Sequence, residues 1–151
     1  MPTYTCASRA GWLDVDRKHA IARAVTRAHA ELTGAPHYFA QVIFEDIADG
    51  NHFVGGQPLE HEHLFIYGRI RAGRSLATRE ALMRRLTADA ATAAGIGPFS
   101  VWVYLLELPP AAMVEFGHIL PEPGTEAAWN AGLPASDRER MDRLGPKPGQ
   151  T

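Results

Sequence analysis

Apolar and polar positions follow strand-like and helix-like spacings in turn over the first part of the chain. Residues 2–8 are rich in β-branched and aromatic side chains, which predicts a strand. Asp14 or Asp16 can cap a helix that carries an apolar residue at every third or fourth position and stops at Gly34. The nearly continuous apolar run at 38–44 predicts a second strand, buried on both faces. Strand, helix and strand together form one crossover unit.

The same order of patterns then repeats. Residues 64–71 predict a strand, Ser75 opens a helix that runs to about Ala94, and residues 99–106 predict another strand. Two β-α-β units of similar length, about 1–60 and 61–110, indicate an internally duplicated fold. We expect one domain over 1–151, of the α/β (α+β) class, with a four-stranded sheet and both helices on one of its faces.

Shorter signals lie between and after the two units. Glycine-containing turns flank a short extended piece at 52–54, and a proline-rich, ordered loop region follows Leu108. Ser136 and Glu139 form a capping-box pattern, which predicts a short helix toward Leu144. The last residues, 147–151, are expected to form a loose tail.

The predicted sheet has a second face that nothing in the chain is long enough to cover. This face is rich in Tyr, Phe and Trp. Large apolar patches of this kind mark interaction surfaces. We therefore expect the chain to form an oligomer.

Composition narrows the function classes. The chain has 151 residues, a formal net charge of −2 and basic residues without a block, so we expect neither nucleic acid nor a membrane surface as a partner. Cys6 is the only cysteine, which excludes an internal disulfide. No targeting segment or long apolar run is seen, so we expect a cytoplasmic protein.

Pro2 is a candidate catalytic group because a small second residue allows Met1 to be removed. The product would carry a free secondary amine at the head of a strand. An amine with a pKa near ~8 can serve as a general acid or base at neutral pH. The alternative is that Pro2 merely starts a strand, where a missing N–H has no cost.

Two other patterns are weaker. His52, His61 and His63 lie close together in sequence, but their spacing matches no zinc pattern and a solvated turn explains them, so no metal is expected. The run from Gly68 to Ser75 only superficially resembles a phosphate loop, because Arg74 stands where the lysine should be.

Arg71 and Arg74 lie between a predicted strand and the start of a helix. Two guanidinium groups beside a positive helix N-terminus can bind a carboxylate, although two solvated loop arginines would look the same. His29, Tyr104 and Glu115 are unremarkable singly: a histidine at the edge of an apolar stripe, a strand tyrosine and a glutamate in a proline-bounded loop.

These residues and the segments around them resemble the cis-3-chloroacrylic acid dehalogenase family of the tautomerase superfamily over nearly the whole chain. The matching segments are Gly73-Arg74-Ser75, Trp102-Val103-Tyr104, Met113-Val114-Glu115-Phe116-Gly117 and Leu120-Pro121-x-Pro123-Gly124-x-Glu126. The resemblance implies duplicated β-α-β chains that assemble as homotrimers and act without a cofactor.

For each residue the resemblance implies a role. Arg71 and Arg74, assisted by His29, would hold the carboxylate of a 3-haloacrylate. Glu115 with Tyr104 would activate a water that attacks the β-carbon, while Pro2 as general acid protonates the α-carbon. The product of cis-3-haloacrylate would be malonate semialdehyde.

Two alternatives stay open. One is keto-enol tautomerisation of aryl enolpyruvates, with Pro2 as general base. The other, of a different class, is a non-catalytic binding protein with a vestigial site. The loop at 34–37 with Tyr38 and Phe39 differs from that of the dehalogenase, and pocket-wall differences of ~1–3 kcal/mol each can reorder substrate preference.

Overall fold

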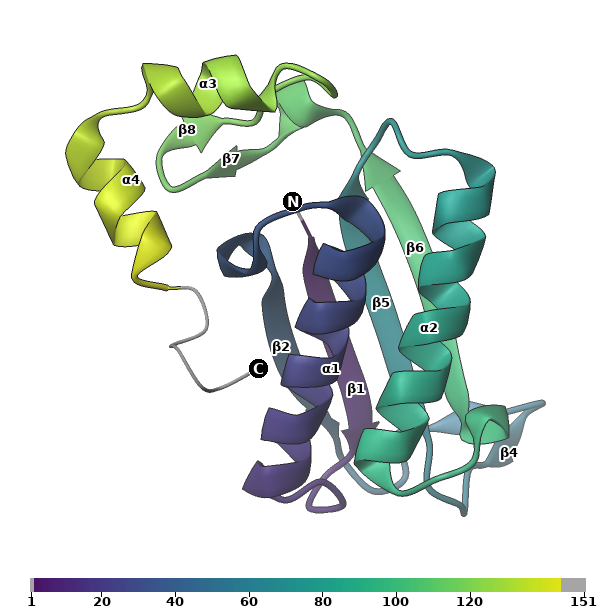
Figure 1. Ribbon diagram of the computed structural model, residues 1–151. Coiled ribbons are helices and arrows are strands. Elements are labelled where there is room, and N and C mark those ends of the chain that lie inside the picture. The colour runs from purple at the N-terminus through teal and green to yellow at the C-terminus, as the bar shows by residue number, and fades with distance from the viewer. Residues whose placement is uncertain (1, 145–151) are drawn as a thin grey trace.

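The computed structural model describes residues 2–144 and has a four-stranded sheet with two long helices on one face (Figure 1). The strands are β1 (Thr3–Arg9), β2 (Gln41–Ile47), β5 (Leu64–Arg71) and β6 (Val101–Leu108). The helices are α1 (Val15–Thr33) and α2 (Leu76–Ala94). The two β-α-β units and the predicted fold class are confirmed.

Strand pairing decides which parts of the chain meet. The order is β2-β1-β5-β6, with parallel pairs β1–β2 and β5–β6 and an antiparallel pair β1–β5 at the centre. In the central pair Thr3 lies opposite Arg69. The beginning of β1 therefore lies beside the end of β5, and α1, which runs back along the sheet, ends near the same place (Figure 1).

Both long helices begin and end where the sequence predicts. Asp14 caps α1 by accepting a hydrogen bond from the Arg17 N–H (2.8 Å), and Ser75 caps α2 by accepting one from the Thr78 N–H (3.1 Å). Each helix ends at a glycine in the left-handed conformation, Gly34 (φ 70°) or Gly95 (φ 74°).

The main hydrophobic core lies between the sheet and the helices. It includes Tyr4 and Ile66 from the sheet, Ile21 from α1 and Leu82 and Leu86 from α2, all fully buried. The opposite side of the sheet, called here the open face, carries exposed large side chains: Ile43, Trp102, Tyr104 and Leu106. The uncovered aromatic face expected from the sequence is thus present in the single chain.

Two strand predictions need correction. Residues 37–39 form a short 3-10 helix (His37–Phe39) closed by a hydrogen bond from the Ala40 N–H to the His37 carbonyl, so β2 starts only at Gln41. The expected burial of this strand on both faces is also wrong, because β2 is an edge strand whose side chains alternate between exposed and half-buried. A 3-10 turn at Pro98–Ser100 similarly delays β6 to Val101.

The loop region after β6 contains several short elements. They are a 3-10 turn (Pro110–Ala112), the hairpin β7 (Val114–Glu115) and β8 (His118–Ile119), and helices α3 (Glu126–Gly132) and α4 (Ala135–Asp142). A second core cluster joins this segment to the 3-10 helix His37–Phe39: Phe39, Leu120, Leu133 and Met141. The segment thereby covers the end of the sheet at which β1 begins (Figure 1).

The capping-box prediction for α4 is wrong. The helix begins at Ala135 after Pro134, without a side-chain cap, and Ser136 lies inside it. Asp137 instead contacts Nε2 of His118 at 2.9 Å, which ties α4 to the hairpin. The predicted tail at 147–151 lies outside the described residues.

The remaining hairpin, β3 (Phe53–Val54) and β4 (Gln57–Pro58), matches the turn-flanked piece expected at 52–54. Nowhere in residues 2–144 is a helix both long and apolar enough to cross a membrane.

Candidate active site

Pro2 is held firmly at the head of β1. Its side chain is fully buried, and its carbonyl accepts a hydrogen bond from the Gln41 N–H at 3.0 Å. The next residue, Thr3, pairs with β2 on one side and β5 on the other. Strands on both sides therefore fix this end of the chain, as expected from the sequence, while Met1 lies outside the described residues.

His29 lies near the end of α1 and is buried (1% exposed). Its Nδ1 is 2.8 Å from the hydroxyl of Tyr4, on β1. Burial, assisted by the Arg74 charge, lowers the pKa of His29 to about 3. Burial also raises the pKa of Tyr4 above its usual value. Both side chains are consequently neutral at pH 7.

The other ring nitrogen of His29, Nε2, is buried and has no hydrogen-bond partner among residues 2–144. Buried polar atoms are seldom left without a partner, because the desolvation costs about 1–3 kcal/mol. Nε2 therefore has a hydrogen-bonding capacity that residues 2–144 do not use.

Arg71 is the last residue of β5 and is almost buried. One of its amino groups, Nη1, donates to the Pro121 carbonyl at 2.9 Å, and Nη2 donates to the carboxylate of Glu126. Both partners belong to the segment after β6. The pair of contacts attaches that segment to the end of the sheet.

Arg74 lies in the turn that leads into α2. Its Nη1 donates to the Arg71 carbonyl at 2.8 Å, whereas its Nε is buried without a partner in the described chain. Burial, together with the charge of Arg71, lowers the pKa of Arg74, yet an arginine stays charged at neutral pH. Arg74 forms no ion pair with residues 2–144, so its charge is available to an anion.

Both arginines line a cavity of about 500 Å³, called here the arginine cavity. Its other walls come from the end of α1 and from the segment around α3, including Tyr38, Phe39 and Trp129. Arg71 and Arg74, which the sequence places near a helix start, therefore line one cavity.

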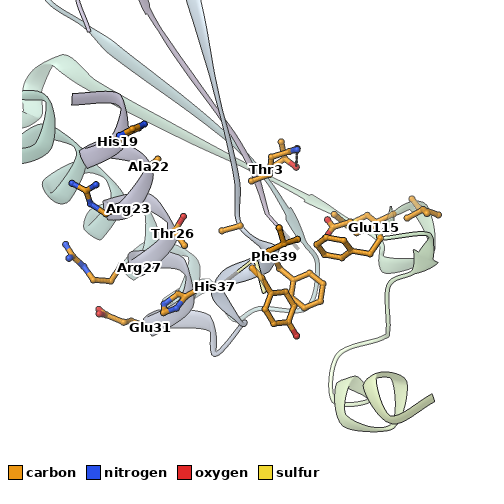
Figure 2. A pocket seen from close by; sticks show the side chains of 18 residues that line it. Thr3, His19, Ala22, Arg23, Thr26, Arg27, Glu31, His37, Phe39 and Glu115 are labelled. Carbon is orange, nitrogen blue, oxygen red and sulfur yellow. Dashed lines mark hydrogen bonds between the residues drawn. The ribbon is translucent and has the colours of Figure 1, made fainter. Parts of the chain in front are cut away.

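Glu115 lies on a different cavity, called here the hairpin cavity (Figure 2). Figure 2 shows residues of α1 on one side, Glu115 on the other and Phe39 between them. Tyr38 and Phe39 line both cavities, so the two cavities adjoin at these aromatic residues. Burial raises the pKa of the Glu115 carboxyl, which makes it a stronger base than an ordinary glutamate.

Glu115 owes its position to the tight β7–β8 turn. Phe116 has a positive φ of 52°, unusual for a bulky residue, and Gly117 follows with φ 84°. The Phe116 ring lies 5.7 Å from that of Phe39. An aromatic contact thus braces the turn next to the glutamate.

Tyr104 is placed apart from the other predicted site residues. It lies on β6 on the open face, 55% exposed, with its ring 5.1 Å from that of Phe65. His29 and Tyr4 lie on the helix side of the sheet. Within one chain the structure does not bring Tyr104 into contact with them.

Two contributors were not assigned a role from sequence. From the sequence, Tyr4 is predicted only as a strand residue, and Glu126 only belongs to one of the segments that resemble the dehalogenase family. Their partners are 25 and 55 positions away, so no local pattern reveals them.

The three histidines 52, 61 and 63 belong to a separate region of the chain. There His63 contacts His52 and Trp102. The described residues contain no cluster able to hold a metal.

Comparisons with known proteins identify the family of the chain. A protein-family model described as a putative oxalocrotonate tautomerase enzyme matches residues 1–132. No curated protein matches the chain.

Solved structures give closer parallels. The chain is 38% identical to N1, a member of the cis-3-chloroacrylic acid dehalogenase family, with a TM-score of 0.90 over 93% of this chain and 99% of that one. Native Ps01740 is 31% identical, with a TM-score of 0.70 over 75% of this chain and 99% of the other. A wild-type fused 4-OT asymmetric trimer shares the fold at 22% identity, with a TM-score of 0.71 over 78% and 94% of the chains. The chain therefore belongs to the cis-3-chloroacrylic acid dehalogenase family of the tautomerase superfamily.

Proposed function

We propose that the protein is a hydratase or dehalogenase of short α,β-unsaturated carboxylates and converts cis-3-haloacrylate to malonate semialdehyde. The observation that carries this proposal is a pair of buried nitrogens without a hydrogen-bond partner among residues 2–144, His29 Nε2 and Arg74 Nε. The charge of Arg74 acts on His29, and that of Arg71 acts on Arg74. A carboxylate offers acceptors for both and a negative charge for the guanidinium groups.

Binding in this way also activates the substrate. The arginines draw electron density from the double bond toward the carboxylate, so the β-carbon becomes electrophilic. Neutral His29 can assist as a hydrogen-bond donor without adding charge. The pocket thus favours the transition state, in which negative charge grows on the carboxylate side.

Water then adds across the double bond. Glu115 takes a proton from the water, whose oxygen forms a bond to the β-carbon, and Pro2 as a protonated amine gives a proton to the α-carbon. The resulting halohydrin loses halide and a proton to give the aldehyde. This mechanism requires a free amine at Pro2, and hence removal of Met1.

Tyr104 can take part only from a neighbouring subunit, because it lies on the open face of its own chain. We propose a homotrimer in which this face is buried, in keeping with the trimers of fused 4-OT. Tyr104 of one subunit would then reach the Glu115 side of the next.

The decisive experiment is incubation with cis- and trans-3-chloroacrylate, following chloride release and product by NMR. Arg74→Ala should lose a charge-assisted contact of roughly 1.5–3 kcal/mol, seen as lower kcat/KM. Arg84→Ala, at an exposed position of α2, is the matched control. Full activity of Arg74→Ala would show that the carboxylate binds elsewhere.

A second candidate is keto-enol tautomerase activity toward aryl enolpyruvates, with Pro2 as general base. The matching family description, a putative oxalocrotonate tautomerase, favours it. Ketonisation of phenylenolpyruvate on the same preparation measures it. Inertness toward all of these compounds, with Met1 verifiably absent, would instead favour a binding protein.

A further inference from the structure

Glu126 is the acidic residue of the arginine cavity. Its Oε1 accepts from Nη2 of Arg71, and its Oε2 accepts from the Gly124 N–H at 2.8 Å. Both oxygens are therefore fixed, although the side chain is 47% exposed. The contact with Arg71 lowers the pKa of Glu126, so its carboxylate stays ionised throughout the neutral range.

Glu126 also determines the charge of this cavity. Among the described residues that line it, the charged ones are Arg71, Arg74 and Glu126. Glu126 compensates the charge of Arg71, whereas Arg74 has no ion-pair partner in the described chain. One positive charge is left, enough for one carboxylate.

We propose that Glu126 is a specificity-determining residue, which restricts the arginine cavity to ligands with a single carboxylate. This inference rests on the proposed function and extends it. A first carboxylate binds to Arg74, which forms no ion pair with residues 2–144. A second carboxylate on the same short ligand would meet the fixed, partly exposed anion of Glu126 in the same cavity, where Arg71 is already engaged.

Glu126 could also be a simple clamp, a residue that only holds Arg71 in place. The charge of its side chain, and not its shape, distinguishes the proposed role from that of a clamp. Glu126→Gln keeps the size of the side chain, and its single amide oxygen can still accept from Arg71, while the Gly124 N–H loses its acceptor. It removes the negative charge and leaves the cavity with two positive charges. A clamp would be largely preserved by this change, but the exclusion of dianions would be lost.

The test is binding of two unreactive saturated ligands, propionate and succinate, measured by calorimetry on the intact protein. Wild type is expected to prefer propionate. Glu126→Gln should raise the affinity for succinate about tenfold more than that for propionate, since the change removes one like charge at short range. Glu122→Gln, an exposed glutamate of the same segment outside the cavity lining, should leave the ratio unchanged.

Arg74→Ala distinguishes the proposed carboxylate site from the role of Glu126. If Arg74→Ala weakens both ligands while Glu126→Gln leaves their ratio at the wild-type value, the role of Glu126 is refuted and the carboxylate site stands. An equal loss of both ligands in Glu126→Gln would show that the substitution disturbs the cavity without a charge-specific effect, and would equally refute the proposal. Binding that is indifferent to Arg74→Ala would overturn the proposed site together with this inference.

Discussion

Tyr4 and His29 form a buried neutral pair, and this has a measurable effect on stability. The pKa of His29 is about 3 in the folded chain and near ~6.5 when unfolded. Between these values the unfolded chain binds a proton that the folded chain does not, so stability falls as the pH decreases from about 6.5.

His29→Gln removes this titration. Its free energy of unfolding should be lower than that of wild type at pH 7, and the gap should narrow by up to about 1.4 kcal/mol per pH unit as the pH falls toward 5. Urea unfolding of both proteins at pH 7, 6 and 5, at one protein concentration, measures the gap. Parallel pH curves would mean that His29 titrates normally in the folded protein.

Glu115 is expected to matter unequally for the two candidate activities. Glu115→Gln is nearly isosteric but cannot accept a proton from water, and loss of a general base typically costs ~10²–10⁴-fold. Halide release should fall by that order, whereas enol tautomerisation, which uses only the Pro2 amine, should hold steady or rise. Equal loss of both activities would show that Glu115 only maintains the shape of the site.

The same glutamate should shape the pH profile of hydration. A general base must be ionised, so kcat/KM should fall as the pH drops through the pKa of Glu115. Because burial raises that pKa, the acid limb should lie above the ordinary carboxyl value near ~4.3. The residual activity of Glu115→Gln should lack this limb, and a limb that persists would belong to another group.

Sequence reasoning found the site residues that carry local signals. Arg71 and Arg74 flank a strand end and a helix start, and the structure places both on one cavity. It could not find Tyr4 or Glu126, because their importance depends on contacts between distant segments. Nor could it show that Tyr104 and His29 lie on opposite sides of the sheet, which depends on strand register.

The turn between β5 and α2 follows Arg71, contains Arg74 and depends on Gly73. This residue has φ 107°, and a Cβ there would lie 2.4 Å from Cγ of Pro123. Gly73→Ala should therefore destabilise the protein by about 1–3 kcal/mol and weaken substrate binding, since the turn and the segment above it must both shift. Denaturant unfolding and KM measure the two effects.

Gly97→Ala is the matched control, because Gly97 has φ −75° and open space around it. It should differ little from wild type. Similar stability of the two alanine variants would show that Pro123 yields without cost.

At the level of elements, long periodic segments were predictable and short ones were not. β5 spans the predicted residues 64–71, because one alternating pattern covers its whole length. The starts of β2 and β6 were missed because 3-10 turns occupy apolar residues, as in His37–Phe39. α3 was not predicted because it has no side-chain cap. β7 and β8 were not predicted because two residues each are too few to show a periodic pattern.

At the scale of the whole molecule, the exposed side chains of the open face predict a trimer. Light scattering should give three times 16.5 kDa, the mass of one chain. Leu106→Arg places a charge on this face and should break the trimer and abolish activity, while the helix-side core keeps its fold by circular dichroism. Val15→Arg, at an exposed position of α1, is the control. An intact trimer of Leu106→Arg would place the subunit interface elsewhere.

The antiparallel pairing of β1 with β5 relates the two halves of the sheet by an approximate two-fold axis. Tyr4 pairs with Val42 as Leu64 pairs with Val101, all on the helix side of the sheet, so the entry to β5, which His63 precedes, corresponds to the entry to β1 at Pro2. The nitrogen of His63, however, is bonded within the chain as an amide. Of the two equivalent strand starts, only that of β1 can provide a secondary amine. Each chain therefore has one reactive amine of this kind. A reagent that alkylates the proposed catalytic amine should therefore give at most one adduct per subunit, because the amide nitrogen at the start of β5 does not react.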